Sequence, residues 1–375
     1  MKPENGLCNY LEIGLNMNDL DQARERISAI DTEMARLFTE RMAQAEIIAQ
    51  YKKKNGLQVH DEATESDIIE RKRLLVDDLA IQDYYIPFIK KVMDLSKDYQ
   101  NRLLQGMKIA YNGVPGAFAY IAARKAYPTA ELISYPDFES AYLACEDGLV
   151  DAVILPVENS FAGDIDNVMD LAFSGSLYIN MMTDLSVTQN LLGLKGASRK
   201  DIKLVASHPN ALAQCSKYIQ ENGFEQKQTA NTAVAAKFVA ENRDVSIGAI
   251  ASEETAKLYG LDILEKHINS TENNTTRFAT FSRTRNDSIR KGRKYEHFVL
   301  MFTVPNEAGA LAKTLNIIGS HGFNMSNLHS RPMKGLLWNY YFYIELEGNI
   351  KSEDGDDLLR QLGTVCDKLK LLGTY

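Results

Sequence analysis

Three cationic side chains lie along one predicted helix near the N-terminus. Arg41 and Lys52 are eleven residues apart, which in a helix places them within about 20° of one face and about 16 Å apart along the axis. Two long side chains at that spacing can hold one dianion between them. Arg24 lies seventeen residues before Arg41, about 25 Å along the same helix, so it must serve another site. An antiparallel dimer in which Arg24 completes the partner's pocket satisfies this geometry.

The spacing of these residues also has a simpler interpretation. Without other evidence, the spacing favours that simpler interpretation. Basic side chains usually cover a solvated helix face, and Lys52, Lys53 and Lys54 form a charged run. The cations therefore need support from neighbouring motifs before they indicate a ligand site.

A second set of polar residues follows short apolar runs in the middle of the chain. Ligands in open α/β sheets bind beyond the carboxyl ends of strands. Pro209 suits a first helical position, with Ser207 or His208 as its cap, so free backbone amides there can receive a carboxylate. Gln214 falls on nearly the same face as Ser207 if the helix starts at once. The motifs are Asn112 to Gly116, Glu158-Asn159-Ser160, Ser207-His208-Pro209 and Ala251-Ser252.

Taken singly, each of these motifs is more typical of the capping and turn chemistry that any strand-helix unit needs. His208 is a possible proton donor, but a histidine at a cap position is more often structural.

The helices and strands that must position these residues belong to three segments of the chain with different sequence patterns. Residues 18–105 have helical periodicity, with an apolar stripe on the first helix. We expect Asn18 or Asp19 to cap that helix, and Asn55-Gly56 to end it beyond Lys53. A second helix is predicted from Asp61 to Leu79 and a third from Tyr85 to Leu104. The stripe comprises Ile27, Ile30, Met34, Leu37, Met42 and Ile47.

Residues 108–283 alternate short apolar runs with small polar residues and helices, as in KIAYNG, DAVILPVENS, KLVASHPN and SIGAIAS. This order predicts β-loop-α units and largely parallel sheets. The span exceeds what one small sheet needs, so two lobes with a cleft are expected. Residues Thr284 to Lys294 are polar and charged, which is typical of a linker.

Residues 295–375 predict a small βαββαβ module of the ferredoxin-like order. We expect strands at His297 to Val304, Asn324 to Arg331 and Leu337 to Leu346, a helix reaching Ser320, a final helix, and a closing strand at LLGTY. Gly309 opens the first helix, where the lack of a Cβ would let a ligand approach the backbone, although glycine is also common in turns.

Composition excludes several classes of protein. The chain has 375 residues, a net charge of -8 and a pI near 5.4, which argues against a nucleic-acid binder. Four scattered cysteines suggest neither a disulfide framework nor a zinc site. No apolar run is long enough for a membrane span, and no signal peptide is recognisable. We expect a cytoplasmic, multidomain protein with small ligands and no membrane partner.

The helical segment resembles the chorismate mutases of the AroQ type, which are all-helical intertwined dimers. The resemblance rests on ARERISAID and on the residues that follow it at family spacing. It implies that Arg24 of the partner, Arg41 and Lys52 bind the substrate carboxylates and ether oxygen. Asp61 and Glu65 would lie near the substrate hydroxyl, and Ser96 and Gln100 would close the site. At Thr64 the family usually has a basic residue. The Claisen rearrangement of chorismate needs a folded substrate and fixed cations, and no nucleophile or metal.

The middle segment resembles prephenate dehydratase, a two-lobed domain like the periplasmic binding proteins. PVENS, SHPNALAQC, YGLDIL and TRF carry the resemblance, and TRF is the most diagnostic. It implies that Thr276 is the key catalytic hydroxyl, supported by Asn159 and Gln214, with Glu158 and Ser207 as further candidates from the same motifs. The identity of the group that supplies the proton stays open.

The C-terminal segment resembles the ACT domain of phenylalanine-inhibited dehydratases, through GAL and SRP. The resemblance implies phenylalanine as effector, bound by Gly309, Ala310, Leu311, Asn324, Ser330 and Arg331. The family tetrapeptide is ESRP, and here His329 stands at its first position.

Together these resemblances imply a homodimer or higher homo-oligomer that makes phenylpyruvate from chorismate through prephenate, without a cofactor or metal. Two alternatives remain. The helical segment could be an inactive dimerisation element, which Thr64 favours, or the two-lobed segment could be a non-catalytic ligand-binding protein.

Overall fold

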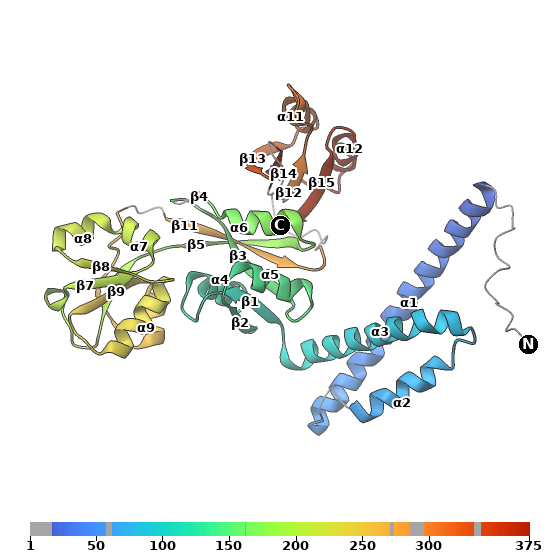
Figure 1. The fold of residues 1–375 in the computed structure, drawn as a ribbon, viewed down its shortest axis with the longest axis horizontal. Coiled ribbons are helices and arrows are strands. Elements are labelled where there is room, and N and C mark those ends of the chain that lie inside the picture. The colour runs from blue at the N-terminus through green and yellow to red at the C-terminus, as the bar shows by residue number, and fades with distance from the viewer. Residues whose placement is uncertain (1–16, 58–61, 162, 271–273, 286–295, 334–338) are drawn as a thin grey trace, which may run out of the picture. The chain divides into compact units, whose positions relative to one another are not determined.

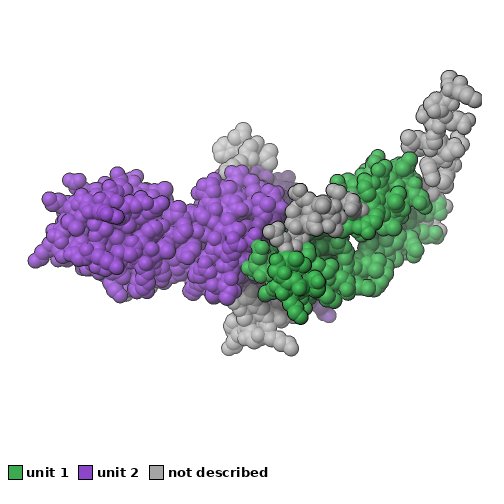
Figure 2. Space-filling view, turned by 90° about the horizontal axis from the view of Figure 1, so that it is seen from below, with its two compact units in different colours: residues 1–106 green, residues 107–375 purple. Residues whose placement is uncertain are grey.

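The computed structural model describes residues 17–57, 62–161, 163–270, 274–285, 296–333 and 339–375. Contacts divide the chain into two compact units, Met1–Gly106 and Met107–Tyr375, which Figure 2 draws in green and purple. Among the residues described, none of the helices combines the length and the apolar character that a membrane span requires.

The first unit consists of α1 (Met17–Asn55), α2 (Glu62–Arg73) and α3 (Leu79–Gln105) (Figure 1). The predicted end of the first helix is confirmed, because Gly56 adopts a φ of 64° and the Leu57 amide donates to the Lys52 carbonyl at 3.0 Å. At the start of α3 the Asp78 carboxylate accepts from the Ala80 amide at 2.8 Å.

Three predicted helix boundaries are wrong. Asn18 and Asp19 lie inside α1 and so do not cap it. The second helix ends at Arg73 instead of Leu79, and the third begins at Leu79 instead of Tyr85. The Asp78 cap starts α3 early, and Pro87 is accommodated within the helix although it donates no backbone hydrogen bond.

The first unit has little core of its own. Among its described residues, the buried apolar side chains are Ala45, Ala49 and Ile89. Most of the predicted apolar stripe of α1 faces solvent in the single chain, with Ile27 58% and Ile47 59% exposed, whereas Met42 is half-buried. An exposed apolar surface of this extent is unusual for a helical unit that stands alone in solution.

The second unit begins with a lobe built on one mixed sheet. β1 pairs in parallel with β2 and β3, and β11 runs antiparallel between β3 and β5. The strands are β1 (Lys108–Asn112), β2 (Glu131–Tyr135), β3 (Ala152–Asn159), β4 (Gly163–Asp164), β5 (Tyr178–Ser186) and β11 (Thr275–Ser282), and the helices are α4 (Phe118–Ala126), α5 (Phe138–Glu146) and α6 (Asp166–Ser174).

The other lobe has its own sheet, in the order β10-β6-β9-β7-β8. The chain enters this lobe after β5 and returns before β11, so the predicted two-lobed fold is confirmed. Its elements are β6 (Asn190–Gly193), the short 3-10 helix η1 (Arg199–Asp201), β7 (Leu204–Ser207), α7 (Pro209–Gln214), α8 (Ser216–Asn222), β8 (Glu225–Gln228), α9 (Thr232–Asn242), β9 (Ile247–Ala251), α10 (Glu253–Tyr259) and β10 (Asp262–Glu265). The predicted linker lies outside the described residues from position 286 onward.

The C-terminal module has the predicted βαββαβ order, with its strands arranged β13-β14-β12-β15. Its elements are β12 (His297–Thr303), α11 (Ala310–Ser320), β13 (Asn324–Pro332), β14 (Tyr340–Glu347), α12 (Glu353–Leu362) and β15 (Lys368–Thr374).

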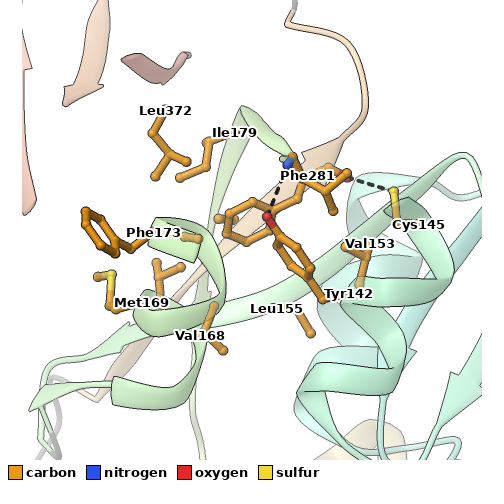
Figure 3. Packing of buried hydrophobic residues seen from close by; sticks show 14 of the residues in the cluster. Tyr142, Cys145, Val153, Leu155, Val168, Met169, Phe173, Ile179, Phe281 and Leu372 are labelled. Atoms are coloured by element: carbon orange, nitrogen blue, oxygen red, sulfur yellow. Dashed lines mark hydrogen bonds between the residues drawn. The ribbon is translucent and has the colours of Figure 1, made fainter. Parts of the chain in front are cut away.

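This module shares a sheet and a core with the first lobe. β15 pairs in parallel with β5 through Gly373 and Ile179, which extends the lobe sheet to ten strands. Figure 3 shows Leu372 of β15 beside Ile179, in the same cluster as Phe281 and Tyr142, whose hydroxyl accepts from the Leu177 amide at 3.1 Å. A Cβ at Gly373 would lie 1.9 Å from the Ile179 carbonyl oxygen, so glycine is required for the close approach of the two strands.

Replacing Gly373 with alanine is therefore expected to push β15 away from β5 and destabilise the second unit by about 1–3 kcal/mol, the usual cost of overpacking. Thermal unfolding of the full chain measures the change. Gly363→Ala is the matched control, because the nearest atoms to a Cβ there lie at 3.4 Å, an ordinary contact. Equal stability of the two variants would contradict the required close approach.

Candidate active site

A cavity of about 370 Å³ is lined by residues from both lobes of the second unit. Its lining contains amides, hydroxyls, aromatic rings and His208, but no Asp, Glu, Lys or Arg among the residues described. The lining residues are Asn112, Gly113, Ala117, Phe118, Ala119, Pro136, Phe138, Pro156, Asn159, Ile165, Val187, Gln189, His208, Asn210, Ala211, Gln214, Ala230, Asn231, Thr232, Thr276 and Phe278. An anion in such a cavity would meet dipoles and not fixed charges.

The hydroxyl of Thr276 is held by Asn159 on the neighbouring strand. These two residues are paired in the register of β3 and β11. Asn159 Oδ1 accepts from the Phe161 amide at 3.0 Å, so its Nδ2 is the donor to Thr276 Oγ1 and to Asn274 Oδ1, both at 2.9 Å. Because Thr276 Oγ1 accepts a hydrogen bond, its own hydrogen is free to point into the cavity. The structure thus brings together two residues that the sequence motifs single out.

Gln214 also lines the cavity, from α7 in the second lobe, and is 6% exposed. Its Oε1 accepts from Gln189 Nε2 at 3.2 Å. Gln189 stands in the segment that enters the second lobe, and sequence reasoning missed it because no recognisable motif surrounds it.

His208 caps α7, as expected, through Nδ1, which accepts from the Asn210 amide at 3.2 Å. Burial lowers the pKa of His208 below its ordinary value, so the ring is neutral at pH 7. A neutral cap is a poor proton donor, which favours the structural role for this histidine.

Two predicted site residues lie outside the cavity lining. Ser207 is fully buried, and its Oγ donates to the Ile250 carbonyl at 2.6 Å, so it joins β7 to β9. The Glu158 side chain leaves the sheet on the face opposite to Asn159, because neighbouring residues of a strand alternate, and it lies 3.6 Å from Arg277 Nη1. The structure therefore does not bring Ser207 and Glu158 to the cavity lining, and their catalytic roles stay predictions.

Arg277 links the strand that carries Thr276 to the C-terminal module. Its guanidinium makes two hydrogen bonds to the carboxylate of Glu345 on β14, at 3.0 and 3.1 Å, and a third to the Tyr375 hydroxyl at 3.1 Å. Burial has the largest single influence and raises the pKa of Glu345, but the hydrogen bonds from Arg277 and Tyr375 and the charge of Arg277 act together against it, and the pKa is lowered. The pair is charged and only 4% of the Glu345 side chain is exposed.

A neighbouring ion-pair group also bridges the lobe and the module. His329 Nδ1 lies 2.5 Å from Asp164 Oδ2, and burial raises the pKa of Asp164 although His329 opposes the shift. Glu158, Asp164 and His329 offer atoms within 4.8 Å of one another. In the described part of the chain both carboxylates already have partners, His329 for Asp164 and Arg277 for Glu158.

The predicted effector residues divide into two sets. Gly309 has a φ of 85°, and a Cβ built there would meet nothing within 4 Å among the described atoms. Asn324 and Ser330 are exposed on β13, and Ala310 and Leu311 are half-buried at the start of α11. Arg331 instead faces the first lobe, where it pairs with Asp166 and Asp170, so the structure does not support its predicted role in effector binding.

In the helical unit, part of the predicted mutase site is assembled. Arg41 Nη1 donates to Ser96 Oγ and to the Val92 carbonyl, and burial lowers the pKa of Arg41. Gln100 is 7% exposed, and its Oε1 has no hydrogen-bond partner among the described residues.

The remaining mutase candidates are described only in part. Lys52 lies further along α1, as its spacing requires. Arg24 is 69% exposed and pairs with Asp21 within its own helix. Asp61 lies outside the described residues, and for Glu65 the structure describes the helix α2 but not the side chain.

Comparison with known proteins matches three families in chain order. The family described as chorismate mutase type II matches residues 23–101, prephenate dehydratase matches 109–286, and the ACT domain matches 298–364. A chloroplastic arogenate dehydratase/prephenate dehydratase from Arabidopsis thaliana is 34% identical over 283 residues, with 72% of each chain covered. A bifunctional chorismate mutase/prephenate dehydratase from Escherichia coli is 29% identical over 375 residues, with 96% of each chain covered.

Among solved structures, the prephenate dehydratase of Arthrobacter aurescens in complex with L-Phe is 26% identical, with a TM-score of 0.66 over 72% of this chain and 89% of that one. The fold, the paired Asn159 and Thr276 and these matches lead to one conclusion. The chain belongs to the prephenate dehydratase family, with a chorismate mutase type II segment before that domain and an ACT domain after it.

Proposed function

We propose that this chain converts chorismate to prephenate in its helical unit and prephenate to phenylpyruvate in the cavity between the two lobes. The observation that carries the proposal is the Thr276 hydroxyl, which Asn159 orients within an uncharged cavity. The ordered match to all three families supports both reactions. Phenylalanine bound at the C-terminal module would inhibit the second reaction, and the enzyme would act as a cytoplasmic homodimer.

The dehydration requires a tertiary hydroxyl to leave as the ring carboxylate departs as carbon dioxide. Aromatisation drives both events, so the enzyme mainly has to orient the substrate and assist the leaving oxygen. Thr276 serves this purpose as a hydrogen-bond or proton-relay donor, since Asn159 occupies the acceptor side of its hydroxyl.

Backbone amides at helix N-termini would hold the substrate carboxylates. α4 and α9 both begin at the cavity, where Ala117, Phe118, Asn231 and Thr232 belong to the lining. Unpaired amides and the helix dipole favour an anion at such a position. This arrangement explains how a cavity without lysine or arginine could accept a dianion.

Replacing Thr276 with valine keeps the shape of the side chain and removes the hydroxyl. We expect dehydration to fall by about 10²–10⁴-fold, the usual contribution of a positioned proton donor. Given chorismate, the wild-type chain should form phenylpyruvate, whereas the variant should accumulate prephenate at an unchanged mutase rate. Normal phenylpyruvate formation by the variant would contradict the role of Thr276, and no product from the wild type would contradict the proposed function itself.

The mutase site would be completed by a second chain. Arg41 meets Ser96 in the described unit, while Arg24 stays exposed far along α1. The apolar stripe around Ile27, Ile30 and Met34 is exposed in the single chain. Burying it against the same stripe of a second copy would bring the partner's Arg24 to the pocket.

Mixing Arg24→Ala chains with Arg41→Ala chains should restore mutase activity that neither variant has alone. Each mixed dimer has one pocket with both arginines, so random mixing should recover about a quarter of wild-type activity. Chorismate consumption after verified exchange of subunits measures the recovery, and each variant mixed with itself is the control. An absence of recovery in verified mixed dimers would show that one chain builds each pocket.

Regulation would act through the sheet that the C-terminal module shares with the first lobe. The predicted effector strand β13 pairs with β14, and Asn327 of β13 stands opposite Glu345. Glu345 in turn holds Arg277, the neighbour of Thr276. An effector that favours one position of β13 would thus shift the strand that bears the catalytic hydroxyl.

Replacing Gly309 with alanine should weaken inhibition by phenylalanine, because the new Cβ would occupy space that the effector approaches. We expect the half-inhibitory concentration to rise at least about fivefold, the lower end of typical allosteric coupling. Gly322→Ala is the matched control, because Gly322 also has a positive φ, 76°, and open space around a Cβ. Dehydratase rate against phenylalanine concentration measures the effect. Equal shifts in both variants would trace the effect to backbone strain and not to the effector site.

A further inference from the structure

Gln189 is a buried amide in the lining of the dehydratase cavity that none of the sequence motifs includes. Gln189 is 1% exposed, and its Oε1 has no hydrogen-bond partner among the residues described. An unpaired buried acceptor costs about 1–3 kcal/mol. A residue with this cost in a ligand cavity indicates a ligand group that completes it.

The position of Gln189 is fixed from three sides. Its backbone amide donates to Asn269 Oδ1 at 3.2 Å, and its carbonyl accepts from the Ile268 amide at 2.9 Å. Its Nε2 donates to Gln214 Oε1 at 3.2 Å. With Nε2 engaged by Gln214, Oε1 is the end of the side-chain amide that has no partner among the described residues, in a residue that lines the cavity.

The same segment lies beside the strand that carries the catalytic hydroxyl. Two residues before Gln189, the backbone amide of Val187 donates to the Asn274 carbonyl at 2.7 Å. The side-chain amide of Asn159, which donates to Thr276 Oγ1, also donates to Asn274 Oδ1. Gln189 and Thr276 thus approach one cavity from adjacent segments, and the first offers an acceptor while the second offers a donor.

The chemistry of prephenate decides which group Gln189 meets. Its two carboxylates and its ketone are acceptors, so the ring hydroxyl is its sole hydrogen-bond donor. Asn112 Oδ1 is a second unpaired acceptor in the lining. No hydrogen bond within the described residues fixes the Asn112 amide, so it can rotate and donate to a carboxylate or the ketone.

We propose that Gln189 Oε1 accepts a hydrogen bond from the ring hydroxyl of prephenate and holds the leaving oxygen against Thr276, an assignment that rests on the proposed function. The bond from the ring to the carboxylate breaks, and its electron pair enters the ring. As Thr276 passes one proton, taken up from the acid of the bulk solvent, to the hydroxyl oxygen, the bond from the ring to that oxygen breaks with its pair on oxygen, so that the prephenate dianion and this one proton together give the phenylpyruvate monoanion, carbon dioxide and water. The products are carbon dioxide, water and phenylpyruvate.

Gln189 contributes more in the transition state than in the ground state. As Thr276 protonates the leaving oxygen, the remaining O–H group becomes more acidic and its hydrogen bond to Gln189 strengthens. A bond that strengthens along the reaction raises kcat more than it lowers KM. The water that forms is still a donor, so the same amide oxygen can hold it until it departs.

Replacing Gln189 with methionine tests the assignment, because methionine keeps the length of the side chain and removes both polar atoms. We expect kcat for prephenate to fall about ten- to 100-fold, in line with hydrogen bonds to groups that gain charge, while KM changes less than threefold. Inhibition by phenylpyruvate, which lacks the ring hydroxyl, should change less than twofold. The mutase rate of the same sample reports the amount of folded enzyme.

Asn190→Leu is the matched control, since Asn190 is the next residue, is 3% exposed and has both ends of its amide paired, to Ala251 and His267. It should lower thermal stability without lowering kcat. A Gln189→Met enzyme with wild-type kcat would overturn the assignment, and so would a parallel loss of prephenate turnover and phenylpyruvate binding. A wild-type chain that does not dehydrate prephenate would overturn the proposed function instead.

Discussion

The ion pair between Arg277 and Glu345 ties the catalytic strand to the C-terminal module. Alternation along β11 sends Thr276 to the cavity and the Arg277 side chain to the opposite face of the sheet. There the guanidinium meets a carboxylate that is almost fully buried, and removing one partner of such a pair costs about 3–5 kcal/mol. Two further carboxylates, Glu158 and Asp184, lie 3.6 Å from Arg277. The guanidinium therefore has alternative partners within its own lobe, which suits a contact that an effector could shift.

Much of the fold follows from local patterns. Alternating apolar runs and helices predict the two lobes, and the order of elements after Tyr295 predicts the C-terminal module. Caps are also local, as His208 with Pro209 and Asn55 with Gly56 show. The pairing between the module and the lobe does not follow from local patterns. Gly373 and Ile179 lie far apart in the sequence, and their pairing is seen only in the folded structure, where β15 and β5 are neighbours in one sheet.

The candidate site was predictable where a motif and the direction of a side chain coincide. Asn159 and Thr276 stand in recognisable motifs and face the same cavity. Glu158 and Ser207 stand in motifs of the same kind, but strand alternation turns Glu158 to the other face and a cross-strand hydrogen bond holds Ser207. Gln189 was not predictable, because its role depends on burial and on an unpaired oxygen and not on its neighbours in sequence.

The location of the dehydration is tested most directly by a crystal structure of the Thr276→Val chain with prephenate, since that variant should bind the substrate without consuming it. We expect prephenate in the cavity between the lobes, with its carboxylates at the N-termini of α4 and α9 and its hydroxyl between residue 276 and Gln189 Oε1. Prephenate bound elsewhere, or bound there with its hydroxyl directed away from residue 276, would contradict the account.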